Sequence, residues 1–199
     1  MKNNNFNNKY LNLIQKNCSD GIGNLHLLNS FFYQNLIIDA AKIIIQCFKK
    51  NKKILVCGNG GSAADSQHFA AELVGKFLIK KRKSYPAIAL STNNSIITSI
   101  ANDSNFNFIF SRQVESLGKI NDILLLISTS GKSKNIINAA KAAKKIKLKT
   151  ILLSGDVNFK LKNLVDLHIP VPAYRVDRIQ ELHILVLHCI SEIIEKELS

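Results

Sequence analysis

The sequence predicts an α/β fold, a doubly wound five-stranded parallel sheet flanked by helices, with long N-terminal and C-terminal helices. Five short apolar runs follow residue 52, at 54–57, 86–90, 123–127, 150–153 and 165–170. They are rich in Ile, Leu and Val and largely lack polar alternation, which is typical of strands buried on both sheet faces. Helical or turn-forming sequence separates the runs, so we expect right-handed crossovers and a parallel sheet.

Helical periodicity covers residues 6–18 and 24–50, and the final segment, 175–198, is predicted to be one helix. The long helices at 24–50 and 175–198 lie outside the strand–helix alternation. The first is too apolar to stand alone in water, so we expect them to cover the sheet or to pack against another subunit. Their apolar faces are formed by Leu27, Phe31, Ile38, Ala41, Ile45 and Phe48, and by Ile179, Leu182, Leu185, Val186, Cys189, Ile190 and Ile193.

The length of 199 residues suits one domain, and no low-complexity linker divides the chain. We therefore expect a single domain over residues 1–199 with an N-terminal helical extension over about 1–50. No apolar run approaches the roughly 18–20 residues that cross a bilayer. No apolar segment of a secretion signal follows Lys2 either. The expected location is the cytoplasm, with no membrane partner.

The cysteines and the charge point to no special partner. Cys18, Cys47, Cys57 and Cys189 form no C-x-x-C pair, which argues against a disulfide framework or a structural zinc knuckle. The formal net charge is +13, but only four of the 27 basic residues are arginines, and arginine is the usual residue for bidentate recognition of bases and phosphates. The densest basic run, residues 80–83, is interpreted as solvated surface, and we expect no nucleic-acid partner.

The first predicted strand ends in a glycine turn, Gly58-Asn59-Gly60-Gly61-Ser62-Ala63, which matches G-x-G-x-x-A. Glycines let a ligand approach the backbone closely, and free N–H groups at a helix start favour an anion. A dinucleotide site also needs an acidic residue at the end of the next strand. That strand ends in Ala89-Leu90-Ser91-Thr92, which disfavours the dinucleotide interpretation.

The third predicted strand leads into Ser128-Thr129-Ser130-Gly131-Lys132-Ser133. The last three residues resemble the end of a Walker A motif, but Leu126 stands where that motif needs its first glycine. Four hydroxyls at a helix start suit a single phosphate monoester. The alternative is ordinary N-capping by Ser130 or Ser133, which requires one hydroxyl and not four.

His68 and Glu72 lie four residues apart on the helix that follows the glycine turn, so they share a face. That spacing suits two metal ligands or an acid–base pair, although such a pair is often only a surface contact. The terminal helix carries Asp177, Gln180, His183 and His188, of which Gln180 and His188 are close to two turns apart. Spacing alone does not bring the two helices together.

Five blocks in order resemble the sugar isomerase (SIS) domain and, within it, the phosphoheptose isomerases. They are CGNGGSAADSQHFAAEL, YPAIAL, IANDSNFNFIFSRQVESLG, DILLLISTSGKSKNI and VDRIQELHILVLH, and the resemblance covers nearly the whole chain. It implies a flavodoxin-like three-layer fold. It also implies a homotetramer with active sites between subunits, to which the two long helices contribute.

The resemblance also implies the roles of individual residues. The sugar chain would be bound by Asn59, Gly60, Gly61, Asn102 and Asp103, and the phosphate by Ser128, Thr129, Ser130 and Ser133. His68, Glu72, Gln180 and His188 would bind one zinc per subunit, with Glu72 and Gln180 also contacting substrate and with Glu72 and His188 as the acid–base pair. Lys76 and Lys132 depart from the family pattern, which often has Arg and Asn there.

The implied reaction interconverts sedoheptulose 7-phosphate and D-glycero-D-manno-heptose 7-phosphate, the first step toward the ADP-heptose of lipopolysaccharide. A carboxylate and an imidazole suit this chemistry, because a ketose–aldose isomerisation moves a proton between C1 and C2 through an enediol. The alternative is a non-catalytic SIS tetramer that binds a DNA replication initiator protein. Such proteins are expected to lack the catalytic carboxylate and the last histidine, whereas this chain has Glu72 and His188.

Overall fold

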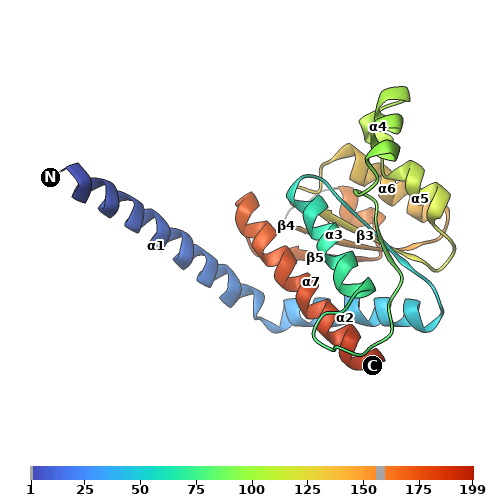
Figure 1. The fold of residues 1–199 in the computed structure, drawn as a ribbon, viewed down its shortest axis with the longest axis horizontal. Coiled ribbons are helices and arrows are strands. Elements are labelled where there is room, and N and C mark those ends of the chain that lie inside the picture. Colours follow the sequence, from blue (N-terminus) through green and yellow to red (C-terminus); the bar gives the residue numbers. More distant parts are fainter. Residues whose placement is uncertain (1, 156–159) are drawn as a thin grey trace.

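The computed structural model describes residues 2–155 and 160–199 and confirms the predicted parallel sheet (Figure 1). The strand order is β2-β1-β3-β4-β5, and all neighbouring strands are parallel. Every strand lies within two residues of a predicted run. The strands are β1 (Ile54–Gly58), β2 (Ala87–Ala89), β3 (Ile123–Ser128), β4 (Lys149–Gly155) and β5 (Leu167–Val171).

Helices cover both faces of the sheet, which gives three layers. One face packs against α2 (Phe31–Lys49), α3 (Gly61–Val74) and α7 (Val176–Leu198). The core of the other face includes residues of α5 and α6, together with residues near the short helices. These elements are α4 (Asn94–Asp103), η1 (Phe106–Phe108), α5 (Ser111–Leu117), α6 (Lys134–Lys145) and η2 (Lys160–Leu164).

The predicted boundary between the first two helices was wrong. Helix α1 (Lys2–Leu28) continues without a break through residues 19–23, and the chain turns only at Asn29 and Ser30. The side-chain amide of Gln34 donates to both the backbone and the side-chain oxygen of Asn29, each at 3.0 Å, and so stabilises this corner. The four-residue spacing of Leu27 and Phe31 carries the apolar periodicity across the turn, which conceals it in the sequence.

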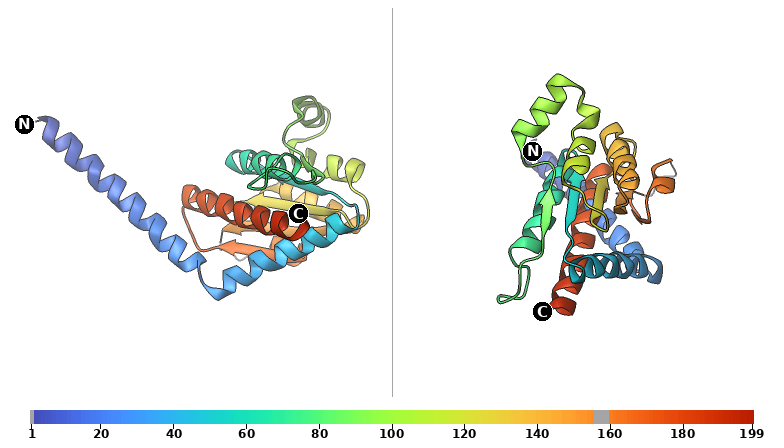
Figure 2. Two further views of the ribbon diagram at one scale, coloured as in Figure 1. Left: turned by 60° about the horizontal axis from the view of Figure 1, so that its bottom comes forward. Right: turned by 90° about the vertical axis from the view of Figure 1, so that its right-hand side faces the viewer.

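Helix α1 extends away from the rest of the chain (Figures 1 and 2). Its side chains include large apolar groups that remain exposed, and Phe31 and Phe32 at the start of α2 are exposed as well. Exposed apolar surface of this extent indicates an interaction site. The apolar residues exposed on α1 are Phe6, Tyr10, Leu11, Leu13, Ile14, Ile22, Leu25 and Leu27.

Helix α2 qualifies on length and composition as a membrane-spanning helix, so the expectation that no segment approaches that length has one exception. Asp39 and Lys42 interrupt the apolar run without lowering its average hydropathy enough to exclude it. Seven of its residues are buried, and the helix packs on the sheet face that it shares with α7. This burial is typical of a core helix. The buried residues are Ile37, Ala40, Ala41, Ile44, Ile45, Cys47 and Phe48.

Candidate active site

The strand order places the candidate site between β1 and β3. The direction in which successive strands are added to the sheet changes at this point. Strand β2 lies on one side of β1, and β3 lies on the other side. Ligands of open parallel sheets bind beyond the carboxyl ends of the strands at such a switch point. The two loops that begin there are the glycine turn at 58–61 and the serine-rich loop at 128–133.

The glycine turn has two positions that require glycine. A Cβ at Gly58 would lie 2.6 Å from the backbone carbon of Ser62, so a side chain there would collide with the first turn of α3. Gly60 has φ +56°, in the left-handed region that glycine adopts at no steric cost. The turn therefore brings backbone close to the start of α3 and leaves Gly60 itself exposed.

A reciprocal amide pair joins the two loops. Asn59 Nδ2 donates to Asn135 Oδ1 at 2.9 Å, and Asn135 Nδ2 donates to Asn59 Oδ1 at 2.8 Å. Asn135 is buried in the first turn of α6 and also accepts a hydrogen bond from the Ile136 N–H. Asn135 could not be predicted as part of the site, because an asparagine in a helix carries no signal of a partner 76 residues away.

The serine-rich loop only partly follows the N-capping alternative. Ser128 Oγ accepts from the Gly131 N–H at 3.0 Å, and Ser130 Oγ accepts from the Lys132 N–H at 3.3 Å. Ser133 occupies the N-cap position of α6 but makes no capping hydrogen bond with its hydroxyl. The Ser133 hydroxyl thus stands at a helix N-terminus, where backbone N–H groups favour an anion.

Helices α3 and α7 pack side by side and bring three chemically important side chains together. His68 Nε2 lies 3.0 Å from Glu72 Oε1, and His188 Nε2 lies 3.4 Å from His68 Nε2. One ligand atom from each residue lies within 4.8 Å of the others, a geometry that could hold a metal ion. The spacing of His68 and Glu72 therefore reflects a real juxtaposition, which His188 completes from the far end of the chain.

Gln180 lies against the start of α3. A Cβ at Gly61 would fall 2.7 Å from Gln180 Cδ, so the absence of a side chain at Gly61 makes room for this amide. Gln180 is two turns before His188 on α7, just as Gly61 is about two turns before His68 on α3. The two helices therefore run in the same direction. The assignment of Gln180 to the metal-binding set stays a prediction.

Asn102 and Asp103 are exposed at the end of α4, which projects from the body of the molecule (Figure 1). Asn102 Nδ2 donates to Asp103 Oδ1 at 2.9 Å, and Ser99 Oγ donates to Asp103 Oδ2 at 3.2 Å. Within the described residues these side-chain contacts are local to α4. Their proposed role toward the sugar therefore gains no support from the geometry of one chain.

Arg82 corrects the interpretation of residues 80–83 as solvated surface. Its guanidinium is fully buried, and Arg82 Nε donates to Glu195 Oε1 at 2.5 Å. The surrounding lysines, at 80, 81 and 83, are exposed as expected. The basic run itself does not indicate which of its side chains is buried, because the partner of Arg82, Glu195, is 113 residues away.

Two further titratable groups lie on the helices that carry the cluster: Asp65 on α3, which the sequence did not indicate, and His183 on α7, which was one of the candidates of the terminal helix. Asp65 lies one turn before His68 on α3, and its Oδ2 is buried without a hydrogen-bond partner in the described chain. Burial raises the pKa of Asp65 to about 6, although the nearby His68 acts in the opposite direction. His183 is completely buried on α7, and burial lowers its pKa to about 4 despite a favourable interaction with the Ser154 backbone.

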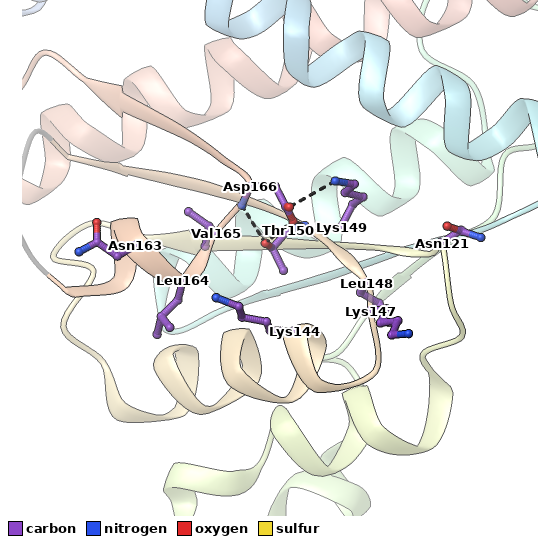
Figure 3. Close-up of a pocket in the computed structure, with 10 residues that line it drawn as sticks. All are labelled: Asn121, Lys144, Lys147, Leu148, Lys149, Thr150, Asn163, Leu164, Val165 and Asp166. Atoms are coloured by element: carbon purple, nitrogen blue, oxygen red, sulfur yellow. Dashed lines mark hydrogen bonds and ion pairs between the residues drawn. The ribbon is translucent and has the colours of Figure 1, made fainter.

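A separate pocket lies at the amino end of β4 (Figure 3). The candidate site lies beyond the opposite, carboxyl ends of the strands. Lys149 pairs with Asp166 at 3.3 Å, and Asp166 also accepts hydrogen bonds from Thr150. Lys144 and Lys147 line the same pocket. None of the described residues that line this pocket belongs to α3 or α7.

Comparison with known proteins identifies the family. The family model described as SIS domain matches residues 33–155. A phosphoheptose isomerase from Campylobacter jejuni is 49% identical over 160 residues, which is 80% of this chain and 86% of the relative. The chain belongs to the phosphoheptose isomerases of the SIS domain family. Another family member, from Clostridium acetobutylicum, is 50% identical over 83% of this chain and 84% of its own length.

Solved structures of phosphoheptose isomerases share this fold. The enzyme structure from Neisseria gonorrhoeae has a TM-score of 0.88 and 37% identity, over 94% of this chain and 99% of that one. The structure from Francisella tularensis has a TM-score of 0.89 and 36% identity, over 94% and 98% of the two chains. The predicted fold class and SIS domain resemblance are both confirmed.

Proposed function

We propose that this chain is an isomerase that interconverts sedoheptulose 7-phosphate and D-glycero-D-manno-heptose 7-phosphate. The single observation that carries the proposal is the cluster of His68, Glu72 and His188 on α7 and on α3, the helix that begins at the switch point of the sheet. Membership of the phosphoheptose isomerase family supplies the substrate. The alternative of a non-catalytic tetramer that binds a replication initiator is not favoured, because both acid–base residues are present and lie in one cluster.

Glu72 and His188 are the proposed acid–base pair. The isomerisation needs a base that takes the proton from one of the two carbons, and an acid that supplies a proton to oxygen in the enediol. We assign the proton transfer at carbon to the Glu72 carboxylate and the proton transfer at oxygen to the His188 imidazole. His68, which contacts both residues, holds them at the same position between α3 and α7.

The donor set suits a zinc ion, one per subunit. Imidazole nitrogens and a carboxylate oxygen are common zinc ligands, and those of His68, Glu72 and His188 lie within 4.8 Å of one another. Gln180 is the proposed fourth ligand. When bound, zinc would act as a Lewis acid and polarise the sugar carbonyl.

Substrate binding is assigned to the two loops at the switch point. The hydroxyls of Ser128, Thr129, Ser130 and Ser133 and the N-terminus of α6 would hold the phosphate. Asn59, Gly60 and Gly61 would face the sugar, together with Glu72 and Gln180. Asn102 and Asp103 are proposed on the family resemblance alone.

The exposed apolar residues of α1 support assembly into a homotetramer. Each subunit is proposed to be a single SIS domain over residues 1–199, with a helical extension over about 1–50. Oligomers of this kind bury such surface against further copies of the same chain. We place the enzyme in the cytoplasm, at the first step toward ADP-heptose for lipopolysaccharide, with no nucleic-acid or membrane partner.

A direct assay tests this function. Purified protein is incubated with sedoheptulose 7-phosphate, and formation of the aldose phosphate is followed with and without added Zn²⁺. Glu72→Gln removes the base but keeps the size of the side chain, so turnover should fall by at least about 100-fold with the fold retained. Glu192→Gln is the matched control, because Glu192 forms a partly exposed ion pair with Lys196 on α7. Near-normal turnover by Glu72→Gln would refute the assignment.

A further inference from the structure

Glu195 is a buried carboxylate near the end of α7, with side-chain exposure of 2%. Its oxygens accept hydrogen bonds from three consecutive backbone N–H groups, at 2.7 Å from Phe77, 2.7 Å from Leu78 and 2.9 Å from Ile79. Arg82 supplies a fourth donor. Glu195 thereby fixes the segment that follows α3 against α7.

Arg82 completes this arrangement from the other side. Its side chain is fully buried, and its Nη1 donates to the carbonyls of Leu73 and Lys83 at 2.8 and 2.9 Å. Its Nη2 donates to the backbone carbonyl of Glu72. Because the last carbonyls of a helix have no partner within the helix, Arg82 caps the C-terminal end of α3.

The buried pair reaches the candidate active site along two routes. Arg82 binds the backbone of Glu72, which is the proposed base. Glu195 binds the N–H of Phe77, and the Phe77 ring stacks on His188 with ring centroids 5.4 Å apart and an interplanar angle of 26°. Glu195 also lies seven residues after His188 and therefore on the same face of α7.

Stability alone does not account for such a pair. Replacing a buried ion pair with well-packed apolar side chains is often neutral or stabilising, because the desolvation of both charges offsets their attraction. A planar guanidinium with several directed donors instead fixes the geometry of the groups that it binds. In this chain those groups are the end of α3 and, through Glu195, the segment that carries Phe77.

We propose that Arg82 and Glu195 are positioning residues for the isomerase, which hold the Glu72 carboxylate and the His188 imidazole in their mutual arrangement. This inference rests on the proposed function. The two residues act through the backbone of α3 and through Phe77, and neither touches the substrate. Such outer contacts matter because the reacting groups must be held within fractions of an ångström of the productive geometry.

Arg82→Lys is the decisive variant. It keeps a positive charge beside Glu195, but a single ammonium cannot reach the carbonyls of Glu72, Leu73 and Lys83 together. We expect kcat to fall about 10- to 100-fold with KM changed less than about threefold, and the Zn²⁺ affinity of the metal-free protein to fall about 10- to 100-fold. The affinity is measured by competition with a chromophoric chelator, at a temperature where circular dichroism shows the variant folded.

Glu197→Gln is the matched control. Glu197 lies two residues beyond Glu195, and its ion pair with Lys49 is exposed on both sides. Its kcat, KM and Zn²⁺ affinity should equal those of the wild type. If folded Arg82→Lys behaves like this control, the proposal is wrong.

Phe77→Leu gives a second test that leaves the buried ion pair intact. It removes the stacking contact with His188, so kcat and Zn²⁺ affinity should both fall, by less than in Arg82→Lys. If Arg82→Lys does not fold, this variant decides, and wild-type values would then overturn the proposal.

The two proposals fail in different ways. A wild-type protein that binds Zn²⁺ but does not convert sedoheptulose 7-phosphate would refute the proposed function, while the Zn²⁺ affinities would still test the positioning role. A wild-type protein that neither binds Zn²⁺ nor shows turnover would overturn both, since no site would exist for Arg82 and Glu195 to position.

Discussion

Asn59 and Asn135 each donate a side-chain hydrogen bond to the other's amide oxygen, at 2.9 and 2.8 Å, across the two loops of the candidate site. Asn59 directly follows β1 and belongs to the glycine turn, and Asn135 lies in the first turn of α6. Through this pair the proposed sugar loop and the proposed phosphate loop are held at a fixed separation.

Asn135→Ala should weaken substrate binding and destabilise the fold. The substitution leaves the half-buried Asn59 amide without its partner, which costs about 1–3 kcal/mol. We expect KM for sedoheptulose 7-phosphate to rise roughly 10-fold, in proportion to about 1.4 kcal/mol of lost binding. Steady-state kinetics and urea unfolding measure the two effects.

Asn138→Ala is the control for that variant, because Asn138 lies on the same helix and donates to the Asn107 carbonyl instead. It should lose stability without a change in KM. An equal rise in KM for both variants would show that the effect belongs to α6 as a whole and not to the link between the loops.

Gly61→Ala should displace Gln180. A methyl group at this position would overlap the Gln180 side chain, with Cδ only 2.7 Å away, so the amide must move or α7 must shift. We expect both turnover and Zn²⁺ affinity to decrease at least about 10-fold. Gly23→Ala, in α1, meets no atom of the described chain within 4 Å, so it should not displace Gln180, and it should stabilise the helix by about 0.5–1 kcal/mol.

Metal removal should abolish most turnover, and added Zn²⁺ should restore it. We expect one Zn²⁺ per subunit in a titration of the metal-free protein. His68→Ala removes the residue that contacts both Glu72 and His188, so its Zn²⁺ affinity should fall at least about 100-fold. His26→Ala, on α1, is outside the cluster and should bind Zn²⁺ like the wild type. Full activity in the presence of a strong chelator would contradict this prediction.

His183 should make the folded state sensitive to acid. Burial lowers the folded-state pKa of His183 to about 4 from the ordinary histidine value of 6.5, so the unfolded chain binds a proton first as the pH falls. The free energy of unfolding contributed by this residue is therefore lost as the pH drops from 6.5 toward 4. Between pH 7 and pH 5 the expected loss is about 2 kcal/mol.

His183→Leu isolates that contribution. The variant replaces a fully buried imidazole with an apolar side chain of similar size, so at pH 7 its stability should lie within about 1.5 kcal/mol of the wild type. Its free energy of unfolding in urea should fall by about 2 kcal/mol less than that of the wild type between pH 7 and pH 5. Parallel pH profiles for the two proteins would exclude His183 as the titrating group.

A second acid-sensitive group lies at Glu195. Burial acts to raise its pKa, but the hydrogen bonds from Arg82 and from the Phe77, Leu78 and Ile79 N–H groups lower it to about 2. Its stabilising contribution is present above pH 4.5 and is lost as the pH falls toward 2. In Glu195→Gln the free energy of unfolding should therefore depend less on pH below pH 4.5. In that range most of the loss that comes from His183 has already occurred.

The fold could be predicted from the sequence because its strands are buried on both faces. Such strands are continuous apolar runs whose limits the sequence itself marks, as at 123–127 and 150–153. The corner at Asn29 and Ser30 could not be predicted, since Leu27 and Phe31 keep a helical spacing across it. The inward turn of Arg82 depends on a carboxylate far along the chain, which no local pattern reveals.

Features that depend only on residues close together in the chain could be predicted from the sequence. The helical repeat places His68 and Glu72 on one face, and the glycines at 58 and 60 prescribe a tight turn before that helix. By contrast, no local pattern places α7 beside α3, and it is this packing that brings His188 Nε2 to 3.4 Å from His68 Nε2 across 120 residues of chain. That distance is fixed by how both helices pack on the same face of the sheet, which is a property of the whole core and not of any segment.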